Sequence, residues 1–314
     1  MDDLRNRLET ALGGAYAVER ELTGGAASRL FLAVETTLHR QVVVKVLAAD
    51  AASAVGAARF KQEMELTAQL QHPHILEVLT AGARDDLLYY VMPYVAGESL
   101  RRRLERQGAL PVADAVLVLH EVADALAFAH AHGIVHRDVK PENILIQGGH
   151  AVIMDFGVAR ALLAARGGRR LTDPGTTVGT VGYMAPEQAA GDRDIDARAD
   201  IYALGKVLYE ISTGKDRNEY PALPEFTGSH AETRDLILLN KIILKACRAR
   251  AWQRYQTAEE MMLALLAFQF NKAALRNKEN TELLTKVFAI IGALAALGIF
   301  GGAVWRFIWL LNHK

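Results

Sequence analysis

The sequence predicts an α+β fold with two lobes, a small β-rich lobe followed by a larger, mainly helical lobe. Strand-like alternation of apolar and polar residues dominates residues 16–95, and helical periodicity dominates residues 96–270. The chain has 314 residues, of which 51% are hydrophobic and 23% charged, so it is long and apolar enough to bury a large core. Residues 1–15 form a short amphipathic lead-in to the first lobe.

Three predicted strands open the first lobe. They read YAVERELTG from Tyr16, then RLFLAVE and QVVVKVLA, and the simplest arrangement for them is a meander. Residues 57–70 follow with helical spacing, which places Phe60 and Glu63 on one stripe. Residues 87–95 (LLYYVMPYV) return to strand character before a proline interrupts them.

The second lobe is predicted from long apolar runs with helical periodicity. We expect helices near residues 112–132, 199–213, 233–247 and 257–271, and a long surface loop over residues 214–229, where proline and glycine are frequent.

Charge and cysteine content exclude several classes of function. The 36 basic residues balance 36 acidic ones, so no overall field attracts nucleic acid. The single cysteine, Cys247, excludes an internal disulfide and any multi-cysteine metal site, which fits a reducing compartment. Residues 1–5 lack the basic-then-apolar pattern of a secretory signal, so we expect the main domain to stay on the side where it is made.

One segment, IVHRDVKPENIL over residues 134–145, has the composition that phosphoryl transfer needs. That reaction requires a carboxylate near the attacking hydroxyl, a cation beside the transferring phosphate and oxygen ligands for magnesium. Asp138, Lys140 and Asn143 are predicted to fill these roles in that order. A polar loop that matches this pattern by chance is the weaker interpretation.

Two further motifs complete the predicted site. Asp155 begins the sequence DFG directly after an apolar strand, where its carboxylate could bind magnesium. Lys45 lies in the apolar strand VVVKV, and a cation there is costly unless a phosphate and a carboxylate satisfy it. Glu63 is the predicted carboxylate partner, and Glu65, about 200° away around the same helix, is the alternative.

Together these motifs resemble the protein kinase family, in particular the bacterial eukaryotic-like serine/threonine kinases, over residues 16 to about 270. GTVGYMAPE at residues 179–187 is similar to the peptide-binding segment of that family, and DIYALG at residues 200–205 to the buried helix that anchors the catalytic loop. The resemblance pairs Arg254 with Glu187. It also implies serine/threonine specificity from Lys140 and Thr180.

The resemblance implies ATP and Mg²⁺, with Mn²⁺ as a substitute, as cofactors, and proteins as substrates. Met92 would lie at the back of the adenine pocket, and the backbone of residues 93–95 would bind adenine. The residues that the resemblance assigns to nucleotide binding are Lys45, Glu63, Leu22, Gly24, Gly25, Leu30, Tyr94 and Val95.

The phosphate-covering loop departs from the family pattern. Residues 22–30 read LTGGAASRL, so Thr23 and Ser28 stand where the pattern has glycines that let the backbone approach phosphates. We expect weaker ATP affinity. A nucleotide-binding pseudokinase scaffold is therefore the alternative function, while the peptide-binding segment speaks against a small-molecule phosphotransferase on a related fold.

Threonines in the loop between Gly157 and Ala185 are candidate regulatory sites. Thr176 and Thr177 are the predicted sites of autophosphorylation, with Thr172 as a further candidate, because a phosphate there could pair with Arg137 and order the loop. The alternative is that these are ordinary solvated threonines.

The C-terminal part is predicted to anchor the chain in a membrane. Residues 287–305 contain 19 residues without a charge or proline, and as a helix they would span about 28 Å. We expect a juxtamembrane segment at residues 271–286 and a single-pass helix at residues 287–311, with the catalytic domain in the cytoplasm on the more basic side. A buried helix or a dimer contact is the alternative, and the Gly298–Gly302 spacing makes a second copy of the chain a candidate partner.

Overall fold

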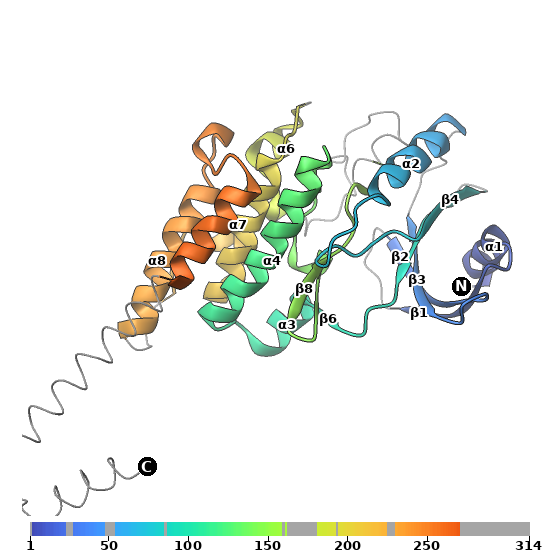
Figure 1. Ribbon diagram of the computed structural model, residues 1–314, viewed down its shortest axis with the longest axis horizontal. Coiled ribbons are helices and arrows are strands. Elements are labelled where there is room, and N and C mark those ends of the chain that lie inside the picture. The colour runs from blue at the N-terminus through green and yellow to red at the C-terminus, as the bar shows by residue number, and fades with distance from the viewer. Residues whose placement is uncertain are drawn as a thin grey trace, which may run out of the picture. The chain divides into compact units, whose positions relative to one another are not determined.

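The computed structural model describes residues 2–22, 28–47, 54–84, 87–158, 161, 181–192, 194–224 and 230–270. Residues Met1–Leu266 form one compact unit and Ala267–Lys314 a second, of which residues 267–270 are described and are helical. The first unit contains a β-sheet lobe and a helical lobe, as the sequence predicts (Figure 1).

The first lobe is built on a five-stranded antiparallel sheet. Its strands are β1 (Tyr16–Leu22), β2 (Ser28–Glu35), β3 (Gln41–Leu47), β4 (Thr80–Arg84) and β5 (Leu87–Pro93), in the order β1-β2-β3-β5-β4. The predicted meander of the first three strands is confirmed by their register. Strand β4 was not predicted, because its sequence TAGAR has little β-propensity and is short.

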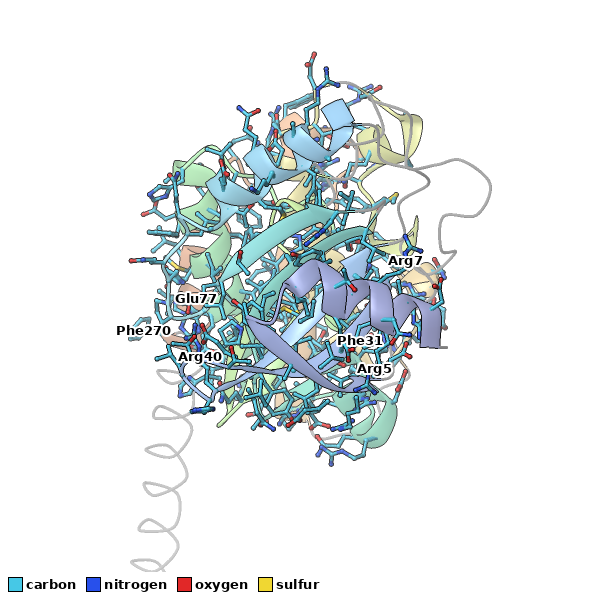
Figure 2. All side chains as sticks on the ribbon, turned by 90° about the vertical axis from the view of Figure 1, so that its right-hand side faces the viewer. Arg5, Arg7, Phe31, Arg40, Glu77 and Phe270 are labelled. Atoms are coloured by element: carbon cyan, nitrogen blue, oxygen red, sulfur yellow. The ribbon has the colours of Figure 1, made fainter. Side chains whose placement is uncertain are left out.

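The two faces of this sheet have separate hydrophobic layers, because successive side chains of a strand point to opposite sides. Helix α1 (Asp2–Leu12) covers one face, where its Leu8 packs with a cluster that includes Phe31 and Val91. Helix α2 (Ala54–Thr67) covers the other, where Phe60 packs with Val43. Figure 2 looks onto α1, which lies in front of the strands beside Phe31.

Three hydrogen bonds attach α1 to the sheet in addition to its apolar contacts. Arg5 Nη2 donates to the carbonyl of Val18 at 2.7 Å, and the hydroxyl of Tyr89 donates to the carbonyl of Ala11 at 3.1 Å. Arg84 of β4 donates to the carbonyl of Thr10 at 3.2 Å. The amphipathic lead-in is therefore a folded layer of the first lobe.

The second lobe is mainly helical (Figure 1). Its helices are α3 (Leu100–Gln107), α4 (Val112–Ala131), α6 (Pro186–Ala190), α7 (Arg198–Thr213) and α8 (His230–Ala246), with a further helix at residues 258–270. This lobe also contains a small sheet of β6 (Glu98–Ser99), which precedes α3, and of β7 (Ile144–Gln147) and β8 (His150–Ile153), which follow α4. Short 3₁₀ turns are η1 (Pro141–Asn143), η2 (Val181–Tyr183), η3 (Arg217–Glu219) and η4 (Ala251–Gln253).

Helix α7 forms the centre of the second lobe, and nearly all of its residues are buried. It approaches the end of α8 closely at Gly205, where a Cβ atom would lie 2.7 Å from Cys247 Sγ. Glycine is needed at this crossing because no larger side chain fits without displacing its neighbours. Cys247 is buried, and this burial raises the pKa of its thiol to about 12.

The predicted juxtamembrane segment 271–286 and membrane helix 287–311 lie outside the described residues. Among the helices just given, none combines the length and the apolar character that a bilayer-crossing helix needs. The region predicted as a surface loop, residues 214–229, contains η3, and its residues 225–229 also lie outside the described part.

Candidate functional site

The catalytic-loop residues predicted from the sequence converge in the structure. Lys140 Nζ lies 2.7 Å from Asp138 Oδ2. Asn143 Nδ2 donates to the same oxygen at 3.1 Å and to the main-chain carbonyl of Asp138 at 2.8 Å. Pro141 starts the turn η1, which carries Asn143 back toward Asp138. A carboxylate, an ammonium group and an amide are thus held together within one loop.

A buried carboxylate on α7 fixes the backbone of this loop. Asp200 is 1% exposed, and it accepts the main-chain N–H groups of His136 and Arg137 at 2.8 and 2.7 Å. His130 Nε2 lies 2.8 Å from it. Burial by itself would raise the pKa of Asp200, but these partners outweigh it and lower that pKa below its ordinary value. The anchoring role that the resemblance gives to this helix is confirmed.

The ring of His136 connects the loop to the DFG segment. Its Nδ1 accepts the N–H of Asp138 at 3.2 Å, so its Nε2 carries the proton that is donated to the carbonyl of Met154 at 2.9 Å. The same ring packs edge-on against Phe156, with 4.6 Å between centroids. Asp155 therefore follows a backbone segment that is tied to the catalytic loop.

The carboxylate of Asp155 is buried and is held by two residues of the first lobe. Lys45 donates to its Oδ2, and the hydroxyl of Tyr90 donates to its Oδ1. Asp155 adopts a left-handed backbone conformation, with φ of 70°. Burial raises the pKa of Asp155, but Lys45 and Tyr90 more than reverse this and lower it.

Sequence reasoning missed Tyr90. It lies directly opposite Lys45 in the pairing of β3 with β5, so both side chains point to the same face of the sheet. Side chains along residues 87–93 alternate between the two faces of the strand. This alternation, combined with the correct register of β3 and β5, could have identified Tyr90.

The position of Glu63 favours it over Glu65 as the functional carboxylate. On α2, the side chain of Glu63 is partly buried, whereas that of Glu65 is exposed. Lys45 contacts Asp155 in this structure, and its pairing with Glu63 stays a prediction. The end of α2 meets the DFG segment, because a Cβ atom on Gly157 would lie 2.5 Å from Thr67 Oγ1.

Part of the predicted nucleotide-binding region is described. Leu22 and Leu30 are partly buried and pack against the cluster that contains Met92. Tyr94 is 40% exposed, and its N–H donates to the carbonyl of Gln41 at 3.2 Å. The adenine contacts of Tyr94 and Val95 therefore stay a prediction, and Gly24, Gly25 and Thr23 lie outside the described residues.

The donor set at Asn143 and Asp155 fits a hard divalent cation. Because Asn143 Nδ2 is used in hydrogen bonds to Asp138, the amide oxygen of Asn143 is the atom that remains for a metal. Magnesium typically takes one or two carboxylate or amide oxygens and completes its shell with phosphates and water. The described residues contain no group of three or more His, Cys, Asp or Glu side chains suited to a metal.

The predicted pair of Glu187 and Arg254 is confirmed. Arg254 donates to both carboxylate oxygens of Glu187, at 2.6 and 2.7 Å, and its own side chain is fully buried. Burial raises the pKa of Glu187, but Arg254 lowers it below the ordinary value. This pair fixes the start of α6, shortly after η2, whereas Thr180 and the candidate phosphosites Thr172, Thr176 and Thr177 lie outside the described residues.

A second charged network near this segment was not predicted. Arg101 of α3 donates to Glu210 of α7 at 2.9 Å and to Glu142 of η1 at 2.8 Å. The hydroxyl of Tyr183 also donates to Glu210. Arg101 and Glu210 belong to none of the motifs found in the sequence and are 109 positions apart, so this network could not be predicted from spacing.

Comparisons with known proteins agree with the geometry of this site. The sequence profile of the protein kinase domain matches residues 16–286. Serine/threonine-protein kinase PknB of Mycolicibacterium smegmatis is 38% identical over 298 residues, which cover 87% of this chain and 47% of that protein. Serine/threonine-protein kinase PrkC of Bacillus subtilis is 34% identical over 296 residues, covering 89% of this chain and 45% of that protein. The chain thus spans less than half the length of these curated relatives.

Proposed function

Because the chain belongs to the protein kinase family, we propose that it transfers the terminal phosphoryl group of ATP to serine and threonine hydroxyls of proteins. The observation that carries this proposal is the convergence of five side chains from both lobes. They are Lys45, Asp138, Lys140, Asn143 and Asp155. The names of the similar proteins support serine and threonine as the acceptors.

Asp138 is the proposed acceptor of the substrate proton. Lys140 and Asn143 hold its Oδ2, whereas its Oδ1 is buried without a hydrogen-bond partner among the described residues. A buried carboxylate oxygen without a partner is unfavourable, and a substrate hydroxyl would supply the missing donor. Asp138 would then orient this hydroxyl and accept its proton during transfer.

The two lysines have separate proposed roles. Lys140 lies beside the oxygen that orients the acceptor, so its ammonium group can steady the phosphoryl group being transferred. Lys45 would exchange its contact with Asp155 for the α- and β-phosphates, and Glu63 would hold it there. The side chain of Lys45 is 13% exposed, so its charge is partly desolvated and favours such a bound phosphate.

Asn143 and Asp155 are the residues that would hold the magnesium ion. When bound, the ion neutralises charge on the phosphates during transfer. Asn143 would use its amide oxygen, and the backbone of Asp155 is already fixed through the contacts of Met154 with the catalytic loop.

We also propose that the kinase phosphorylates its own loop at Thr176 or Thr177, with Thr172 as a further site. A phosphate adds about 1.5 to 2 negative charges, which could pair with Arg137 next to the catalytic aspartate. Phosphopeptide mapping of the chain made in cells tests this. An Asp138→Asn chain should lack the modification, and its absence from both chains would contradict the proposal.

The apolar segment within residues 287–311 is proposed to anchor the kinase in a membrane, with the catalytic domain in the cytoplasm and a second copy of the chain as a candidate partner. The support is the uncharged run and the flanking Lys286 and Arg306. Membrane fractionation of the full chain should place it in the pellet. A full chain that remains soluble would contradict anchoring.

Incubation of the full chain with radiolabelled ATP, magnesium and a generic basic protein tests the proposed activity. Label should appear on phosphoserine or phosphothreonine, and it should fall about a hundredfold or more in Lys45→Ala and Asp138→Asn. ATP binding without any transfer would instead support the pseudokinase scaffold, with Thr23 and Ser28 as the first positions to restore to glycine.

A further inference from the structure

Tyr90 and Lys45 hold opposite oxygens of one carboxylate. The two residues face each other across β3 and β5, and their polar ends reach Oδ1 and Oδ2 of Asp155. Lys45 has an expected role with the phosphates, whereas the Tyr90 hydroxyl belongs to none of the motifs that predict the site. It is buried directly beside the carboxylate that is expected to bind the metal.

The two contacts differ in how easily they can be released. Tyr90 is 1% exposed, and its ring packs in a cluster with Phe60 and Met64 of α2, so the hydroxyl has little freedom to move. Lys45 carries its ammonium group on a flexible four-carbon chain. When a nucleotide provides phosphate oxygens, Lys45 can leave Oδ2, whereas Tyr90 remains on Oδ1.

The Tyr90 hydroxyl acts as a hydrogen-bond donor here, because the carboxylate oxygen that it contacts can only accept. A donor fixed on one oxygen sets the rotation of the carboxylate and leaves the other oxygen for a cation. Partners of this kind typically change the affinity of a metal site by tenfold or more.

We propose that Tyr90 is a positioning residue for the metal, holding Oδ1 of Asp155 so that Oδ2 is presented to the divalent cation of the nucleotide complex. This inference rests on the proposed function, because it requires a metal-bound nucleotide in the same site.

The test measures the binding of Mn²⁺ to the full chain. The electron paramagnetic resonance signal of free Mn²⁺ reports how much metal remains unbound. An ATP analogue with a non-hydrolysable imido bridge between the β and γ phosphates is present, and its affinity is also measured without metal. The variants are Tyr90→Phe, which removes only the hydroxyl, and Tyr89→Phe. Tyr89 is a matched control because it lies on the same strand but donates to Ala11 on the opposite face.

We expect Tyr90→Phe to bind Mn²⁺ about tenfold more weakly than the unmodified chain, with the metal-free affinity for the analogue unchanged. Tyr89→Phe should bind Mn²⁺ as the unmodified chain does. Unchanged or tighter Mn²⁺ binding by Tyr90→Phe would overturn the positioning role, as would an equal loss in both variants. If the unmodified chain binds no Mn²⁺–nucleotide complex, the proposed function fails, and the inference fails with it.

Discussion

The two halves of the site are held in different ways. In the helical lobe, the catalytic loop is fixed through its main chain, because the N–H groups of His136 and Arg137 both bind the buried Asp200. In the sheet lobe, Lys45 reaches Asp155 only through a long side chain. Asp138, the proposed acceptor of the substrate proton, is thus placed by a rigid scaffold, while Lys45, the proposed phosphate ligand, can change partners.

This difference fits what each half must do. Proton acceptance requires a fixed distance and orientation, which main-chain hydrogen bonds to a buried helix provide. Nucleotide binding and release require groups that can be exchanged between a resting partner and a phosphate. Substitutions that loosen the catalytic loop or α6 should therefore lower stability, whereas substitutions near Lys45 should lower the rate of phosphoryl transfer.

The largest effect is expected at the buried anchor. Asp200→Ala should lower the free energy of unfolding by about 4 kcal/mol, because two main-chain N–H groups lose their acceptor inside the protein. Denaturant unfolding of the full chain measures this, and Asp200→Asn, which keeps one acceptor oxygen, should lose less. The control is Asp196→Ala, whose side chain is 51% exposed and should cost about 1 kcal/mol. Equal losses at the two aspartates would refute the anchor.

The same residue gives a pH dependence with a defined sign. The pKa of Asp200 is lowered in the folded chain, so its charged form contributes stability above the unfolded-state pKa of about 3.9. This contribution is lost as the pH falls below that value toward the folded pKa. The stability difference between the unmodified chain and Asp200→Ala should therefore be constant near neutral pH and shrink in acid. A difference that grows in acid would contradict the assignment.

A slightly smaller loss is expected where Arg254 fixes Glu187 at the start of α6. Arg254→Met should cost about 3 kcal/mol, because it leaves Glu187 and the carbonyl of Arg248 without their donor. The stability of Arg254→Lys should lie between that of the unmodified chain and that of Arg254→Met, since an ammonium group cannot bind both carboxylate oxygens as the guanidinium does. Thermal unfolding checks both variants, with Arg198→Met, a partly exposed arginine that donates to Asp196 and Gln256, as the control. If Arg254→Met were as stable as that control, the Glu187–Arg254 pair would not stabilise the helical lobe.

The part of the site around Lys45 in the sheet lobe is tested by the rate of catalysis and not by stability. Glu63→Gln should lower the rate of phosphoryl transfer by about tenfold to a hundredfold, the effect of losing one charge-assisted hydrogen bond to Lys45. Glu65→Gln on the exposed side of α2 should stay within about twofold of the unmodified chain. Initial rates at varied ATP concentration measure both. If Glu65 proves to be the sensitive position, the predicted pairing is wrong.

The smallest effect is expected at the outer layer of the sheet lobe. Tyr89→Phe removes one hydrogen bond to Ala11 of α1 and should lower the free energy of unfolding by about 1 kcal/mol. The rate of transfer should not change, because the hydroxyl lies on the face opposite Lys45. A loss of transfer activity without a loss of stability would show that α1 and the site are coupled.

Sequence alone predicted those parts of the site that lie in short motifs. Asp138, Lys140 and Asn143 are close in the chain, so their spacing already requires them to meet, and the Arg254–Glu187 pair came from the family resemblance. The contact of Tyr90 with Asp155 joins residues 65 positions apart and depends on the exact register of two strands. Neither composition nor periodicity carries that information.

The fold shows the same limit. The apolar stripes predicted the strands and long helices, whereas β4, with its TAGAR sequence, forms because β5 offers an edge to pair with. Its stability comes from tertiary contacts with α2 and β5, which no local pattern in residues 80–84 reveals.

The pairing of Lys45 with Tyr90 also bears on how faithfully the sheet assembles. A shift of one residue in β3 would turn Lys45 toward the layer beneath α1, where Val44 and Val91 are fully buried. A charged ammonium group without a partner there would be unfavourable by several kcal/mol. Lys45, the proposed nucleotide-binding residue, therefore also favours the correct register, since a misaligned sheet cannot accommodate its charge.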